Sequence, residues 1–205
     1  MAKVTTRTRI QERNRGAILD AALGIFSQYG FRGSTLDQIA EASGLSKPNL
    51  LYYFPSKEAI HVELLESLLD TWLDPLRAMK ADADPVEEIL AYVHGKLEMA
   101  RKFPRESRLF ANEILQGAPR ILNDLTNGLK PLVDEKAALI REWSDAGKIA
   151  PVDPYHLIFS IWATTQHYAD FEVQVRALTR SEDDGHFDRA EAFLTDFYRR
   201  ALRPD

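Results

Sequence analysis

Residues 35–57, TLDQIAEASGLSKPNLLYYFPSK, decide the fold of this chain because they predict two short helices joined by a tight turn. Thr35 is a good N-cap for the first helix. Gly44 can adopt the positive φ that ends this helix and turns the chain. Ser46 is placed to cap the second helix, which we expect from Lys47 to Phe54. The stretch therefore predicts a helix-turn-helix unit.

The second of these helices has one apolar face and one polar face. Leu50 and Phe54 are expected to be buried, which leaves the remaining side chains free to face outward: Lys47, Asn49, Tyr52 and Tyr53. In a helix-turn-helix unit the second helix enters the major groove of DNA. A helical hairpin without a nucleic-acid role is the alternative that this pattern alone leaves open.

Basic side chains are concentrated at the N-terminal end of the chain. Residues 1–57 carry eight Lys or Arg and four Asp or Glu, whereas the rest of the chain carries 18 and 27. The net charge of the whole chain is −5, so the protein is not basic throughout. A basic end on an acidic remainder attracts phosphate to the region of the predicted helix-turn-helix.

The composition is that of an ordinary globular protein, with 205 residues, 45% apolar residues and no cysteine. Without cysteine there are no disulfides or thiolate-bound metals, which fits a reducing cytoplasm. The chain has no apolar run of about 18 residues or more, and its N-terminus lacks the apolar core of a signal peptide. We therefore expect a cytoplasmic protein that has no membrane partner.

The sequence also predicts that the protein is not an enzyme and needs no metal or cofactor. It contains no P-loop, no dinucleotide-binding glycine pattern, no HExxH motif and no cysteine nucleophile. An acid–base pair among Glu98, Glu113 and Asp170 leaves a small-molecule-binding helical enzyme open as an alternative. Arg108 lies near Glu113 in the sequence, and we expect these two side chains to form an internal ion pair.

No segment alternates between apolar and polar residues, so the fold is expected to be all-α, with about nine helices. Residues 1–55 form a predicted three-helix head, and residues 56–205 form a helical-bundle body for ligand binding and dimerisation. A helix over 56–80, bent at Pro75, would begin the body directly after the head's signature. The other expected helices cover residues 10–29, 85–101, 104–117, 119–146, 154–178 and 186–202.

The expected helix over 154–178 has two apolar-rich faces, which indicates two packing roles. Four residues share the inner face: Ile158, Trp162, Gln166 and Asp170. The other face has Phe159, Ala163, His167 and Phe171. A buried glutamine needs partners, and its amide offers a donor beside an acceptor, as a lactam or imide edge requires. A core tryptophan next to a structurally satisfied glutamine is the alternative.

The stretch over 35–58 resembles the DNA-binding signature of TetR-type transcriptional regulators. The matching features are the threonine before the first helix, the AEASGLS turn and the LYYFPSK ending. The resemblance implies a homodimer that binds double-stranded operator DNA. We expect four side chains to contact phosphates: Thr35, Ser46, Tyr53 and Lys57. Three others are better placed for base edges: Lys47, Asn49 and Tyr52.

The body is similar to that of TetR-type regulators of pyrimidine utilisation, in the segments LLDTWLDPL, KLEMAR, SRLFANEI and WATTQHYADF. This resemblance implies that the body binds uracil or thymine and that operator DNA is then released. The implied ligand-binding residues are Trp72, Lys96, Ser107, Trp162 and Gln166. The region 181–188 departs from the resemblance, so a different small, aromatic or apolar effector stays open.

The resemblance also implies a dimer seam made by the helix over 154–178 and the last helix. Four aromatic side chains are expected to supply its apolar contacts: Phe159, Phe171, Phe193 and Phe197.

Overall fold

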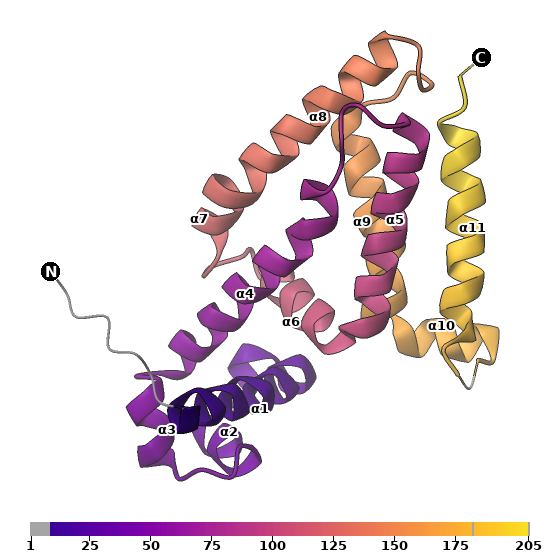
Figure 1. Ribbon diagram of the computed structural model, residues 1–205. Helices are drawn as coiled ribbons and strands as arrows, with labels where there is room; N and C mark the ends of the chain where they lie inside the picture. Colours follow the sequence, from indigo (N-terminus) through magenta and orange to yellow (C-terminus); the bar gives the residue numbers. More distant parts are fainter. Residues whose placement is uncertain (1–8, 182, 205) are drawn as a thin grey trace, which may run out of the picture.

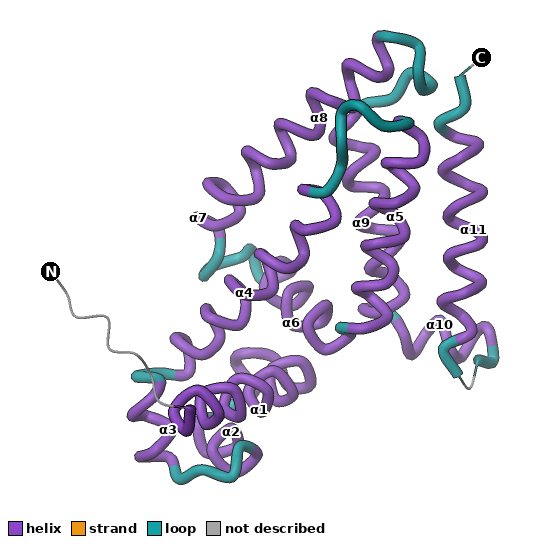
Figure 2. Tube along the Cα trace, in the orientation of Figure 1, coloured by secondary structure: helices purple, strands orange, loops and turns teal. Residues whose placement is uncertain are grey.

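The computed structural model describes residues 9–181 and 183–204, and regular structure in this part of the chain is helical (Figure 1). Figure 2 shows helices joined by short loops and no strand among the described residues. The prediction of an all-α fold is confirmed.

The head is built from three helices: α1 (Arg9–Gly33), α2 (Leu36–Ala42) and α3 (Lys47–Tyr53). The expected end of the first helix at Gly30 appears as a kink, because Gly30 has φ 67° and the chain forms one more turn beyond it. The core of the head comes from all three helices and includes Ile18, Phe26, Ile39, Leu50 and Phe54. This core fixes the angle at which α3 is presented.

One long helix, α4 (Lys57–Arg77), runs from the head into the body, as Figure 1 shows. Ser56 caps it by accepting a hydrogen bond from the N–H of Ala59 at 3.1 Å. Pro75 lies inside the helix, as expected from the sequence. Its ring is close to Gly95 of the next helix, α5 (Pro85–Lys102), where an added Cβ would lie 3.0 Å from the Cβ of Pro75.

The rest of the body is a bundle in which α5 packs between α9 (Pro154–Asp170) and α11 (Gly185–Ala201) (Figure 1). Its core contains Val93, Ile158, Ile161, Leu194 and Tyr198. The helix α6 (Pro104–Leu115) contacts both the body helix α9 and the head helix α1. This helix is therefore the body's main support for the head, besides α4.

Two expected helices are interrupted. The helix expected over 119–146 begins only at α7 (Leu122–Asp124), passes through a π-helical turn η1 (Leu125–Leu129) and continues as α8 (Lys130–Asp145). This π-helical turn contains Gly128.

The helix expected over 154–178 is wrong as a single element, because it breaks at Phe171 and continues as α10 (Glu172–Thr179). Phe171 has φ −113° and ψ 28°, outside the helical range. At this break the guanidinium of Arg108 lies 3.5 Å from the carbonyl oxygen of Ala169 and 3.4 Å from the carboxylate of Glu172. A side chain from α6 therefore serves a backbone carbonyl that a continuous helix would pair internally, and it ion-pairs with the first residue of α10.

Across the described residues, every helix is too short or too polar to span a lipid bilayer.

Candidate functional site

The helix-turn-helix is held by caps that the sequence predicted. Thr35 and Gln38 form a capping box, in which the Thr35 hydroxyl accepts from the Gln38 N–H at 3.2 Å and the Thr35 N–H donates to Gln38 at 2.8 Å. Ser46 caps α3 by accepting from the N–H of Asn49. Gly44 has φ 69° and turns the chain between the two helices. The turn is thus fixed by side-chain caps on both helices and by the positive φ of Gly44.

The outward side of α3 agrees with the sequence-based expectation. Leu50 is fully buried, while Lys47, Asn49 and Tyr52 are exposed and Tyr53 is partly buried. The ammonium of Lys47 lies 2.9 Å from the carboxylate of Asp37 on α2. Both partners are exposed, so DNA can displace this pair at small cost.

The two tyrosines at the end of α3 are linked to α1. The side-chain amide of Gln11 donates to the Tyr52 hydroxyl at 3.3 Å, and that of Asn14 donates to the Tyr53 hydroxyl at 3.1 Å. Each hydroxyl accepts in these bonds, so its own hydrogen remains free to donate. A tyrosine that donates outward suits a phosphate oxygen.

The ammonium of Lys57 is turned toward the protein. It donates to the carbonyl oxygens of Phe31 and Ser34, both at 2.6 Å, and so holds the end of α1. Two of its three hydrogens are used in these bonds, which leaves one for the phosphate contact expected from the sequence.

Four of the five expected ligand-binding residues meet at one cavity in the body. Its volume is about 60 Å³, measured as the space open to the centres of water molecules. Trp72, Lys96, Trp162 and Gln166 line it. The structure adds Tyr92, Phe110 and leucines of α4 and η1 to this lining. Helices far apart in the sequence therefore converge at the expected place.

Two hydrogen-bond donors in this lining, Trp72 and Lys96, are poorly satisfied by the protein. The Nε1–H of Trp72 is buried and has no hydrogen-bond partner among the described residues. The Lys96 side chain is 5% exposed, and its Nζ lies 4.7 Å from the centre of the Trp72 ring. Burial lowers the pKa of Lys96 to about 8, against the opposing effect of Asp170. The cavity thus holds a poorly solvated ammonium next to an unpaired N–H.

The second tryptophan is anchored by a tyrosine. The Nε1–H of Trp162 donates to the hydroxyl of Tyr92 at 2.5 Å. Burial raises the pKa of Tyr92, so this hydroxyl stays protonated. The plane of Trp162 is therefore fixed from across the cavity by α5.

Ser107, the fifth expected residue, lies outside the lining of the cavity. Its hydroxyl donates to the carboxylate of Asp170 at 2.5 Å. Burial raises the pKa of Asp170, although the Ser107 bond and the nearby Arg108 and Lys96 act against this shift. Ser107 therefore acts on the cavity indirectly: it binds Asp170, whose charge in turn influences the ammonium of Lys96.

The cavity adjoins a much larger apolar groove between α6, η1 and α9. This groove has a volume of about 620 Å³ by the same measure. Phe110, Leu129, Trp162 and Gln166 line both spaces. Phe171, one of the expected dimer-seam residues, lines the groove as well.

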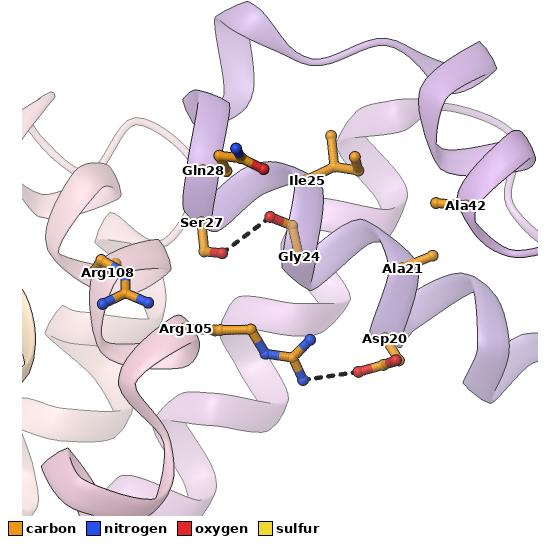
Figure 3. A pocket seen from close by; sticks show the side chains of 9 residues that line it. All are labelled: Asp20, Ala21, Gly24, Ile25, Ser27, Gln28, Ala42, Arg105 and Arg108. Carbon is orange, nitrogen blue, oxygen red and sulfur yellow. Dashed lines mark hydrogen bonds and ion pairs between the residues drawn. The ribbon is translucent and has the colours of Figure 1, made fainter. Parts of the chain in front are cut away.

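A third space, of about 580 Å³, is a cleft lined by residues of α1, by Ala42 at the end of α2 and by two arginines of α6 (Figure 3). An ion pair between Arg105 and Asp20 crosses it at 2.8 Å. Arg108 lines both this cleft and the apolar groove. The expected ion pair between Arg108 and Glu113 is wrong: Arg108 pairs with Glu172, and Glu113 pairs with Arg120 at 2.9 Å.

The sequence reasoning missed Tyr92 and Phe110 as lining residues. Tyr92 lies one helical turn before Lys96, a spacing that places both on one face of α5. That spacing was a usable signal. Phe110 had no comparable signal, because its place depends on how α6 crosses α4. Among the described residues, no cluster of three or more His, Asp or Glu is arranged to hold a metal ion.

Comparisons with known proteins agree with this architecture. Residues 18–64 match the family model for bacterial regulatory proteins of the tetR family. Residues 65–205 match the model for the C-terminal region of YcdC-like proteins. The two models meet inside α4, whereas the expected domain boundary at residues 55 and 56 stays a prediction.

The chain is 55% identical over 173 residues to the HTH-type transcriptional regulator RutR of Escherichia coli K12, covering 84% of this chain and 82% of that protein. The relatives are transcriptional regulators, which confirms the prediction of a regulator rather than an enzyme.

Solved structures share the fold at low identity. AibR in complex with isovaleryl coenzyme A and operator DNA is similar with a TM-score of 0.72 at 20% identity, covering 94% of this chain and 100% of that one. A TetR-like regulator from Rhodococcus sp. RHA1 is similar with a TM-score of 0.68 at 19% identity, covering 96% and 97%. The chain therefore belongs to the TetR family of ligand-responsive, DNA-binding transcriptional regulators.

Proposed function

We propose that this protein is a homodimeric regulator that binds operator DNA through α3 and releases it when uracil or thymine binds in the body. The observation that carries the proposal is the cavity lined by Trp72, Lys96, Trp162 and Gln166. We propose a cytoplasmic location, because a regulator must reach DNA.

The exposed side of α3 supports the mode of DNA binding. Lys47 and Asn49 stand on the outer face near the start of the helix, where a recognition helix contacts bases. Asparagine can pair with adenine, and lysine can contact guanine. Thr35, Ser46, Tyr53 and the remaining hydrogen of Lys57 would contact phosphates on either side. In a dimer the two copies of α3 would enter major grooves about 34–36 Å apart.

The chemistry of the cavity favours a ring with two carbonyl groups. Trp72 and Lys96 can only donate hydrogen bonds, and the amide of Gln166 can donate and accept. A ligand that satisfies these side chains must therefore present mainly hydrogen-bond acceptors. The imide edge of uracil or thymine offers two carbonyls around one N–H. Cytosine replaces one carbonyl by an amine, which would place a donor against donors, so we expect it to bind more weakly.

A second candidate effector is a larger apolar or aromatic compound. The specific observation in its favour is the groove of about 620 Å³, which exceeds what a single pyrimidine ring requires. An occupant of this groove would contact Phe110, Leu125 and Phe171. Thermal-shift measurements with uracil, thymine, cytosine, xanthine and bulky apolar compounds separate the two candidates. Stabilisation by an apolar compound but not by uracil would refute the pyrimidine proposal.

The dimer is supported by aromatic side chains that this single chain leaves exposed. Phe159, Phe171, Phe193 and Phe197 are between 47% and 62% exposed and lie on α9, at its end, and on α11. Phe193 and Phe197 stack on each other with ring centroids 6.0 Å apart. Apolar surface of this kind on two helices suits a four-helix seam with a second copy.

The decisive experiment is a mobility shift of the intergenic DNA beside the gene, with and without uracil. We expect salt-sensitive binding that uracil weakens. Tyr53→Phe should weaken binding to specific and unspecific DNA alike, whereas Asn49→Ala should mainly reduce the preference for the operator. A protein that retains the operator equally at saturating uracil would contradict the proposed response.

A further inference from the structure

A buried cluster of polar and charged side chains lies where the head meets the body, outside both the DNA-reading surface and the effector cavity. Glu113 of α6 is 1% exposed, and His61 of α4 is 2% exposed. The guanidinium of Arg120 donates to one carboxylate oxygen of Glu113 at 2.9 Å, and its backbone N–H donates to the other at 2.8 Å. Pairing with Arg120 offsets the cost of burying the carboxylate of Glu113 but gives little net stability. We therefore interpret the pair as one that fixes the position of α6 relative to its neighbours.

Arg120 also contacts the head. Its guanidinium carbon lies 3.7 Å from the centre of the Phe31 ring, which is in the last turn of α1. The ammonium of Lys57 lies 4.3 Å from the centre of the same ring and binds the carbonyl oxygen of Phe31. Two cations from outside α1 thus hold the end of this helix. One of them is fixed in turn by Glu113 of the body.

The helix that carries Glu113 also forms a wall of the effector site. Phe110 lines the cavity and the groove, and its ring centroid is 5.3 Å from that of Trp72. Leu109 is buried in the same apolar cluster as the core of the head, together with Ala118 and Ile121. Because the residues of one helical turn move together, an occupant that displaces Phe110 also displaces Leu109 and Glu113.

We propose that Glu113 and Arg120 form a positioning clamp through which α6 sets the angle of the head, so that effector occupancy changes operator affinity. This inference rests on the proposed effector response. The competing route is α4 alone, which carries Trp72 at the cavity and begins at the head. Only the first route requires the ion pair between Glu113 and Arg120. The contact of Arg120 with α4 is longer and more exposed, since the Nε of Arg120 lies 3.6 Å from the carboxylate of Glu58.

The test uses a double variant, because replacing Arg120 alone would leave the carboxylate of Glu113 buried without a partner. Glu113→Gln with Arg120→Met removes both charges and keeps an acceptor for the Arg120 backbone N–H. The matched control is Asp20→Asn with Arg105→Met, which neutralises an ion pair between α1 of the head and α6 of the body. That pair is exposed, at 71% for Asp20 and 45% for Arg105, and should matter little.

The measured quantity is the ratio of operator dissociation constants with and without saturating uracil, in the full-length protein. Typical couplings give ratios of about 5–150. We expect wild type and control to share one ratio and the double variant to fall close to unity. Calorimetry without DNA should show that all three proteins bind uracil within about twofold of each other, since linkage separates binding from coupling. A double variant that binds uracil and keeps the wild-type ratio would overturn the clamp.

A wild-type ratio of one would refute the effector proposal rather than the clamp. Amide hydrogen exchange of residues 31–36 therefore tests the clamp without any effector. It should be faster in the double variant than in wild type and control, and equal exchange would overturn the inference. If the double variant does not fold, Arg120→Lys retains the charge but lacks the planar fork that pairs with Glu113 and covers Phe31. An unchanged ratio and unchanged exchange in Arg120→Lys would then count against the clamp.

Discussion

At the scale of single residues, burial lowers the pKa of both His61 and Lys96, but its cost to stability appears at different pH values. The ring centroid of His61 lies 4.8 Å from that of Phe26 and 4.9 Å from that of Phe31. These apolar surroundings favour the neutral imidazole over the charged form. Lys96 remains charged at neutral pH in an equally closed setting. His61 therefore costs little stability at neutral pH and opposes folding in acid, whereas Lys96 already opposes folding at neutral pH.

His61 should make the protein sensitive to acid. Burial, with Arg120 and Lys57 acting in the same direction, lowers the pKa of His61 from 6.5 to about 4. The unfolded chain therefore takes up a proton first, and up to about 3 kcal/mol of stability is lost as the pH falls from 6.5 through 4. Urea denaturation at a series of pH values should show a shallower loss in His61→Leu than in wild type. An exposed-histidine control, His156→Gln, should follow wild type, and parallel curves for all three proteins would contradict this account.

Lys96→Met should stabilise the effector-free protein and weaken its binding of uracil. The folded-state pKa of about 8 lies below the ordinary value of 10.5, so the buried charge disfavours folding below pH 8. The buried charge lowers the free energy of unfolding by about 1–3 kcal/mol at pH 7, and this loss disappears as the pH rises from 8 to 10.5. Denaturation at pH 7 and 10 should show the difference between variant and wild type shrinking at the higher pH.

The matched control for this prediction is Lys136→Met. Lys136 is also buried, but its ammonium donates to the carbonyl oxygen of Met79 at 3.2 Å and pairs with Glu135. Its removal leaves that carbonyl without this donor and should destabilise the protein. If both methionine variants changed stability in the same direction, burial alone would not explain the role of Lys96.

Much of the site could be predicted at this scale, and the limits have a physical cause. Caps such as Thr35, Ser46 and Ser56 depend on neighbours within three residues, so a local pattern is sufficient. Trp162 and Gln166 share a face by helical spacing, and the structure confirms that they line one space. The partners of Arg108 and Glu113 depend instead on how helices cross, and the simplest local pairing was therefore wrong.

At the scale of elements, the close approach of α4 and α5 rests on Gly95. We expect Gly95→Ala to destabilise the protein by about 1–3 kcal/mol, because the new methyl group would press on the stiff ring of Pro75. This loss would exceed the gain of about 1 kcal/mol that alanine brings to a helix. Chemical denaturation measures the difference.

Gly16→Ala in α1 is the control, since nothing lies within 4 Å of its added Cβ. It should stabilise the protein by about 0.5–1 kcal/mol. Stabilisation by both alanine variants would show that Pro75 can move aside.

The helix breaks show why element boundaries were harder to predict than element types. The sequence around Phe171 is compatible with a continuous helix, and the break is supported by Arg108 from α6. The π-helical turn at η1 had a local signal in Gly128, yet nothing local indicated its hydrogen-bond pattern. Tertiary contacts decide both cases.

At the scale of the whole molecule, the proposed mode of DNA recognition requires two heads held at a fixed spacing. We expect Phe193→Glu with Phe197→Glu to separate the subunits, because the new charges would be buried without partners in the seam. Sedimentation at micromolar concentration should give a mass near 23.3 kDa for this variant. Its operator affinity should fall by more than tenfold, as each head then binds alone.

Leu122→Glu is the control for the dimer, since Leu122 is an exposed leucine on α7 outside the expected seam. It should sediment as wild type does. A wild-type protein that was already monomeric at this concentration would remove the basis of the paired-groove arrangement.

Phe171 lies both at the apolar groove and in the proposed dimer seam, and this affects how the two subunits would take up effector. It lines the apolar groove and also belongs to the aromatic set expected between the subunits. In the proposed dimer, a molecule that fills one groove would touch the boundary between the subunits and so alter the groove of the second copy. Saturation of the two sites should then deviate from a simple hyperbola, so that small changes in effector concentration produce a sharper or a more graded response than independent sites allow.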